Sequence, residues 1–156
     1  MSSTMMSPFW KLWIVRLLIG VVLALNLQAS IIFIINPEPY TPSFELTGVP
    51  GVAAVRGIGI LFLMWTIPYF FAVYHPVRYK NFLVASFIMQ AIGVLGETLL
   101  YLDLPGGYAV LRSSIERFIL FDAGGLLLLL LALLMVHISK PNSRKDNHES
   151  IPINCP

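Results

Sequence analysis

The chain has 156 residues, of which 57% are hydrophobic and only 12% are charged, and its net charge is +2. Its mean hydropathy is +0.80. Because soluble domains carry about 25% charged residues, this composition leaves too little polar surface for a water-soluble globule. No basic stretch combines with aromatic residues outside the apolar segments, which argues against nucleic-acid binding. The composition therefore predicts an integral membrane protein in contact with the lipid bilayer.

Four apolar stretches each reach the roughly 20 residues that a helix needs to cross the hydrocarbon core. We expect helices at residues 10–35, 52–74, 82–102 and 111–137, with an N-terminal cytoplasmic segment at 1–9 and a disordered cytoplasmic tail at 139–156. Alternating short strands, which a transmembrane barrel would need, are absent. The sequence therefore predicts an all-α fold, a four-helix transmembrane bundle within a single domain, 10–138.

The first stretch also imitates a cleavable signal peptide, because Lys11 precedes an apolar run that ends in Leu27-Gln28-Ala29. The apolar character resumes over residues 31–35, beyond the cleavage site that this interpretation would require. We therefore expect an uncleaved first helix, while the cleaved form remains the alternative.

Lysine and arginine residues predict the orientation. They flank the connections at one side of the bundle (Lys11, Arg78, Lys80, Lys140, Arg144 and Lys145), whereas the two other loops carry Glu38, Glu45 and Asp103. The positive-inside rule then places the N and C termini in the cytoplasm. Aromatic residues, Tyr69 among them, are expected near the membrane interfaces.

Charged residues inside the apolar stretches are the unusual feature of this chain. A charge near the centre of a transmembrane helix costs about 2.5–3.5 kcal/mol on insertion scales, so such residues usually face the bundle interior. Gln90, Glu97 and Tyr101 share one helix face with Ser86 and Gly93. We therefore predict a buried polar cluster in the outer half of the bundle, formed by Arg56, Gln90, Glu97, Glu116, Arg117 and Asp122.

Two interpretations of this cluster remain open. In the first, Arg56 and Arg117 neutralise the carboxylates in a structural ion-pair network, without a ligand. In the second, the cluster lines a polar pocket that binds a quinone or a lipid head group, or relays protons. Two arginines facing three carboxylates would leave one carboxyl group without a cation.

No catalytic or metal-binding motif occurs in the sequence. His75 and His137 have no further ligands at a recognised spacing, so we predict no metal site. Cys155 is the only cysteine, which excludes an intramolecular disulfide. The balance favours a protein without its own catalysis, and no cofactor is required by the sequence.

The layout resembles the DoxX-like superfamily of small four-helix bacterial membrane proteins. The likeness lies in Val15-Arg16-Leu17-Leu18-Ile19-Gly20, in the Pro-rich loop that follows the first helix, and in Ala54-Val55-Arg56-Gly57-Ile58-Gly59. It implies a bacterial cell membrane. Some members of this superfamily are associated with quinone-linked sulfur oxidation or with membrane redox assemblies, which makes a quinone a candidate cofactor. The likeness implies no catalytic residues at positions of this chain.

Three functions follow from these observations. The first is an accessory or structural membrane subunit, partnered by other membrane subunits or by copies of itself. The alternative is a quinone- or lipid-binding redox-accessory protein with a polar pocket in the outer half of the bundle. A small transporter is disfavoured, because four helices without internal repeats would have to oligomerise to form a path.

Overall fold

The computed structural model describes residues 8–138, in which four long helices alternate with short connections. The helices are α1 (Pro8–Ile35), α2 (Gly48–Tyr74), α3 (Lys80–Asp103) and α4 (Ala109–Ile138). All four are long and apolar enough to cross a membrane, which confirms the predicted four-helix transmembrane bundle. Residues 1–7 and the expected tail, 139–156, lie outside the described residues.

The connection between α1 and α2 contains a helix that hydropathy does not predict. This seven-residue 3-10 helix, η1 (Glu38–Phe44), follows the proline that ends α1. Helix α2 then begins at Gly48, four residues before the expected start at 52. Pro50 is accommodated in the first turn of α2, where a backbone N–H would have no partner within the helix.

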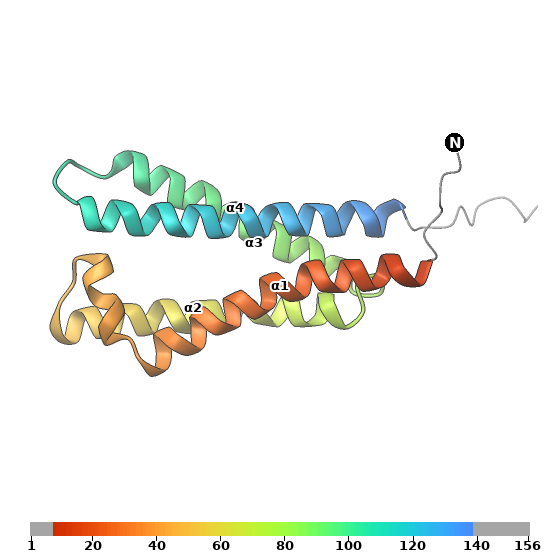
Figure 1. Cartoon of the computed structure of the whole chain (residues 1–156), viewed down its shortest axis with the longest axis horizontal. Helices are drawn as coiled ribbons and strands as arrows, with labels where there is room; N and C mark the ends of the chain where they lie inside the picture. The colour runs from red at the N-terminus through yellow and green to blue at the C-terminus, as the bar shows by residue number, and fades with distance from the viewer. Residues whose placement is uncertain (1–7, 139–156) are drawn as a thin grey trace, which may run out of the picture.

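Each helix packs against its neighbour in sequence, and α4 also packs against α1, so the four helices form a closed ring. Figure 1 shows α1 with α2 in one layer and α4 in the other, with α3 behind. We call the end where α1 begins and α4 finishes the termini end, and the opposite end the η1 end. Toward the η1 end α1 diverges from α4, and η1 lies between them (Figure 1).

Aliphatic side chains fill the core of the termini half. The cluster draws on all four helices at three- and four-residue steps: Val15, Ile19, Val22, Tyr69, Ala72, Leu83, Leu129, Ala132 and Val136. In the η1 half, Phe33, Val55 and Phe62 form a second cluster, against which aromatic rings from η1 and α4 pack. Tyr69 belongs to the first cluster, and its hydroxyl points to the polar residues of α3 and α4.

Candidate functional site

A chain of hydrogen bonds crosses the centre of the bundle from α2 through α3 to α4. The Tyr69 hydroxyl donates to Gln90 Oε1, and Gln90 Nε2 donates to Asp122 Oδ1 at 2.8 Å. The three side chains are 1%, 3% and 5% exposed, respectively. Because the amide of Gln90 bonds a different helix at each end, this chain joins three helices at one level of the bundle.

Two glycines bring the helix backbones close enough for these bonds. A Cβ added at Gly93 would overlap Asp122 Oδ2, and one added at Gly125 would lie 2.7 Å from Gln90 Nε2. Real Cβ atoms essentially never approach a neighbour that closely. Glycine at both positions therefore permits the close contact between α3 and α4, as small residues do in other membrane bundles.

Glu97 extends the polar region along α3 toward the η1 end. It lies four residues, or about one helical turn, beyond Gly93 on the same helix face, and Gly93 directly faces the carboxyl group of Asp122. Its Oε2 atom is buried and has no hydrogen-bond partner. The structure thus brings together Gln90, Glu97 and Asp122 of the predicted cluster.

The two arginines of the predicted cluster lie elsewhere. Arg56 and Arg117 are both exposed on the outside of the bundle. Within residues 8–138 neither forms an ion pair with a carboxylate. The structure therefore does not contain the predicted network in which Arg56 and Arg117 neutralise the carboxylates. Val55 points into the core. Because successive residues of a helix are rotated by about 100°, Arg56 points about 100° away from the direction of Val55. Asp122 is five residues from Arg117, which places it about 140° around α4.

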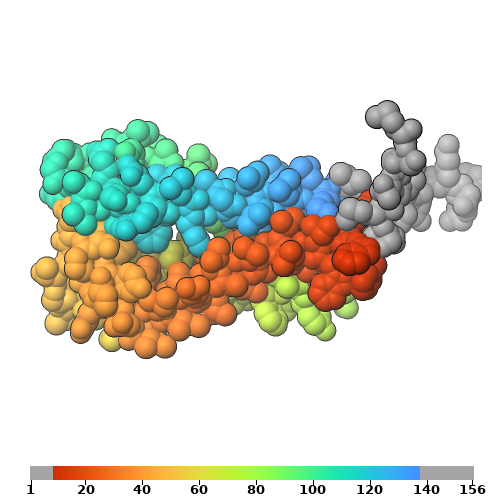
Figure 2. Space-filling view, in the orientation of Figure 1, coloured from red at the N-terminus to blue at the C-terminus, as the bar shows by residue number. Residues whose placement is uncertain are grey.

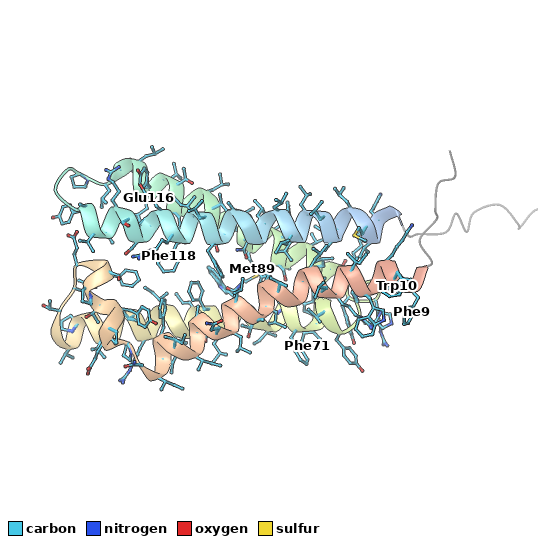
Figure 3. The ribbon with its side chains drawn as sticks, viewed as in Figure 1. Phe9, Trp10, Phe71, Met89, Glu116 and Phe118 are labelled. Atoms are coloured by element: carbon cyan, nitrogen blue, oxygen red, sulfur yellow. The ribbon has the colours of Figure 1, made fainter. Side chains whose placement is uncertain are left out.

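Glu116 also lies outside the buried cluster. It is exposed, and its Oε1 accepts a hydrogen bond from the Tyr101 hydroxyl at 2.8 Å. Figure 3 shows Glu116 on the side of α4 toward α3, with Phe118 on the opposite side toward η1. Arg112 lies over the Tyr101 ring at 4.6 Å from its centroid. Tyr101, Arg112 and Glu116 therefore stabilise the turn between α3 and α4.

An open groove follows the seam between α1 and α4 from the η1 end to the middle of the bundle (Figure 2). It consists of three adjoining hollows of about 340, 250 and 400 Å³. The first two share Phe33 and Tyr40 in their walls, and the last two share Leu25. We call it the α1–α4 groove; its walls include Leu25, Phe33, Tyr40, Phe118, Phe121 and Gly124.

A cluster of polar groups lies at the η1 end of this groove, and Gln28 is a further polar side chain in its wall. Arg117 Nη2 donates to Ser114 Oγ at 2.9 Å, and Ser114 Oγ donates to the backbone carbonyl of Ser43 at 2.6 Å. All three residues line the groove. Toward the middle of the bundle the walls are apolar, and Gly125 separates the groove from Gln90 behind it. The groove and the central hydrogen-bond chain are therefore neighbouring but distinct features.

Two features of this region, the burial of Tyr69 and the bond from Ser114 to Ser43, were not predicted from the sequence. Tyr69 was expected at a membrane interface, but it is buried in the core. It continues the buried stripe of α2, in which Val55, Gly59, Phe62 and Thr66 recur at three- and four-residue steps, and that spacing could have identified it. The bond from Ser114 to Ser43 joins residues 71 positions apart, and no local pattern in the sequence indicates it.

The fold fits a small multi-pass membrane protein, with a polar centre and a groove on the side of the bundle. Comparisons with protein families, with characterised proteins and with solved structures find no match to the chain.

Proposed function

We propose that this protein is an accessory membrane protein that binds a lipid-like molecule in the α1–α4 groove and has no catalysis of its own. The observation that supports the proposal is the groove itself. Its walls toward the middle of the bundle are apolar apart from Gln28, and Ser43, Ser114 and Arg117 lie together at its η1 end. An amphiphile has the same distribution, with a polar head at one end of an apolar chain.

The length of the groove suits a lipid from one leaflet. Its walls on α4 extend from Ser114 to Leu128, a separation of fourteen positions that spans about 21 Å at 1.5 Å per residue. Half of the hydrocarbon core of a bilayer is about 15 Å thick. A chain anchored at the η1 end would therefore remain in contact with the groove across its own leaflet.

The central hydrogen-bond chain supports an accessory role rather than a catalytic one. Its side chains form hydrogen bonds with one another, from Tyr69 to Gln90 and from Gln90 to Asp122. They lie behind the wall of the groove. This chain of hydrogen bonds ties α2, α3 and α4 together at one level of the bundle and keeps α3 fixed against α4. The alternative occupant is a quinone, which would make the protein a redox-accessory subunit.

Filling the groove tests this proposal. A Cβ at Gly124 meets nothing within 4 Å, and Gly124 lines the groove, so the side chain of Gly124→Leu starts in open space and should occupy the groove. Gly96 is an exposed glycine of α3 with equally open surroundings, and Gly96→Leu is the matched control. After extraction in mild detergent, native mass spectrometry should show lipid adducts on the wild type and on Gly96→Leu.

Most of that adduct should be lost from Gly124→Leu. Equal retention by the two leucine variants would show that the groove is not the binding site. An adduct with the mass of a quinone would replace the lipid assignment by the redox-accessory alternative.

We also propose that the termini end faces the cytoplasm of a bacterial cell. Lys11 near the start of α1, Arg78 between α2 and α3, and Lys80 at the start of α3 all lie at this end, and the positive-inside rule supports that orientation. Chemical labelling of Cys155, the only cysteine in the sequence, tests this orientation. In right-side-out membrane vesicles an impermeant maleimide should label Cys155 only after the vesicles are opened, and labelling of sealed vesicles would reverse the assignment.

A further inference from the structure

We propose that the lipid in the α1–α4 groove is an anionic phospholipid, with its phosphate at Arg117 and one acyl chain along the groove. This inference rests on the proposed function and adds the chemical class of the ligand. Three features support it: a guanidinium group without a carboxylate partner among residues 8–138, the bonds that hold this group in place, and the apolar walls that lead away from it.

Within the part of the chain that the structure describes, no carboxylate forms an ion pair with Arg117. A guanidinium group carries five N–H donors, and Arg117 donates from Nη2 to the neutral hydroxyl of Ser114. The neighbouring carboxylates have other partners: Glu116 accepts from Tyr101, and Glu45 Oε1 accepts from the backbone N–H of Leu111 at 3.2 Å. An exposed cation at the mouth of the groove therefore remains available to an anion.

The position of Arg117 suits a phosphate at the membrane surface. It lies eight residues after Ala109, the first residue of α4, or about 12 Å along the helix axis, and arginine side chains extend from such depths toward the head groups. Ser114, which is 2% exposed, holds the guanidinium group beside η1. Guanidinium groups bind phosphates through paired hydrogen bonds, so a phosphate can dock at this position.

Two other arginines near helix ends, Arg16 and Arg112, are engaged with the protein itself. Arg16 Nη2 donates to the carbonyl of Tyr74 at 3.2 Å, at the end of α2. Arg112 Nη2 donates to the carbonyl of Leu104 at 2.9 Å. Both satisfy helix-terminal carbonyl groups. Arg117, in contrast, lines the groove with Phe33, Phe44 and Phe118.

The same charge discriminates between classes of lipid. A zwitterionic phospholipid brings its own cation to the head-group region, and a quinone head carries no charge to pair with Arg117. An anionic phospholipid offers a net negative charge together with an acyl chain for the apolar walls. Charge complementarity therefore favours the anionic class.

The test uses the full chain in mild detergent with an equimolar mixture of phosphatidylglycerol and phosphatidylcholine that have identical acyl chains. Native mass spectrometry measures the ratio of the two bound lipids. We expect about tenfold enrichment of phosphatidylglycerol on the wild type, the size of effect that one charge-assisted contact produces. Arg117→Gln should bring the ratio close to parity, and Arg117→Lys should keep most of the enrichment.

Arg56→Gln is the matched control, because it removes an exposed arginine from the first half of α2, outside the groove. It should keep the wild-type ratio. Enrichment that persists in Arg117→Gln, or that is absent from the wild type, overturns the inference. If the glutamine variant does not fold, Arg117→Met, which keeps an apolar stem, gives the same measurement. Retention of both lipids by Gly124→Leu would instead overturn the proposed function.

Discussion

Toward the termini end, the four helices pack against one another mainly through aliphatic side chains. Toward the η1 end α1 diverges from α4, and η1 with its aromatic side chains lies between them. In the termini half, Ile19, Leu83 and Leu129 are 0% exposed. In the η1 half, Phe118 of α4 contacts the rings of Phe44 and Phe62 at centroid distances of 6.0 and 6.2 Å. There η1 replaces a direct contact between the two long helices.

The difference shows where a lateral opening can form in a bundle of this size. Lipid tails are as apolar as leucine, so helix association depends on close packing and hydrogen bonds rather than on removal of apolar surface from water. The termini half relies on close packing. In the η1 half, η1 acts as a wedge between α1 and α4, and the bond from Ser114 to Ser43 holds it in place. The α1–α4 groove lies where η1 does not fill the space between these two helices.

The largest effect is expected from a cavity in the termini half. Leu129 is 0% exposed, so Leu129→Ala should lower the free energy of unfolding by about 3 kcal/mol, as core truncations of leucine do. Leu134, which is 50% exposed on the same helix, is the control, and Leu134→Ala should change it by less than about 0.5 kcal/mol. Unfolding titrations with a denaturing detergent measure both. Similar losses in the two variants would mean that the termini half is not closely packed.

A smaller effect is expected where the two halves meet. A Cβ at Gly93 would overlap Asp122 Oδ2, so Gly93→Ala should cost about 2 kcal/mol, within the range for overpacked sites. Gly96→Ala meets open space and should gain up to about 1 kcal/mol from helix propensity. The thermal midpoints in detergent should therefore move in opposite directions. A Gly93→Ala variant as stable as Gly96→Ala would show that α3 and α4 are further apart than the structure indicates.

The sequence was sufficient to predict the four transmembrane helices, because the hydropathy of a stretch of about 20 residues does not depend on the rest of the fold. It was also sufficient to group Gln90 with Glu97, which share a helix face. It was not sufficient to locate Arg56, Glu116 and Arg117, because the rotation of a helix about its axis depends on its neighbours. Helix η1 was missed because its seven residues are too short for a periodicity.

The smallest global effect is expected from the bond that holds η1 against α4. Ser114→Ala removes the donor to the carbonyl of Ser43 and the acceptor for Arg117. Hydrogen bonds between helices in membranes contribute about 0.6 kcal/mol on average, so the unfolding free energy should fall by about that amount. Ser113→Ala, at the exposed neighbouring position, should change nothing measurable.

The local effect of Ser114→Ala should be larger than the global one. Amide hydrogen exchange in η1 should accelerate, because local opening there no longer requires this bond to break, while exchange in the middle of α4 should stay as in Ser113→Ala. Equal exchange of η1 in both serine variants would mean that the aromatic contacts of Phe44 and Phe118 alone hold the wedge. The η1 half would then be stabilised by packing, as the termini half is, and Arg117 would be free to leave the mouth of the groove.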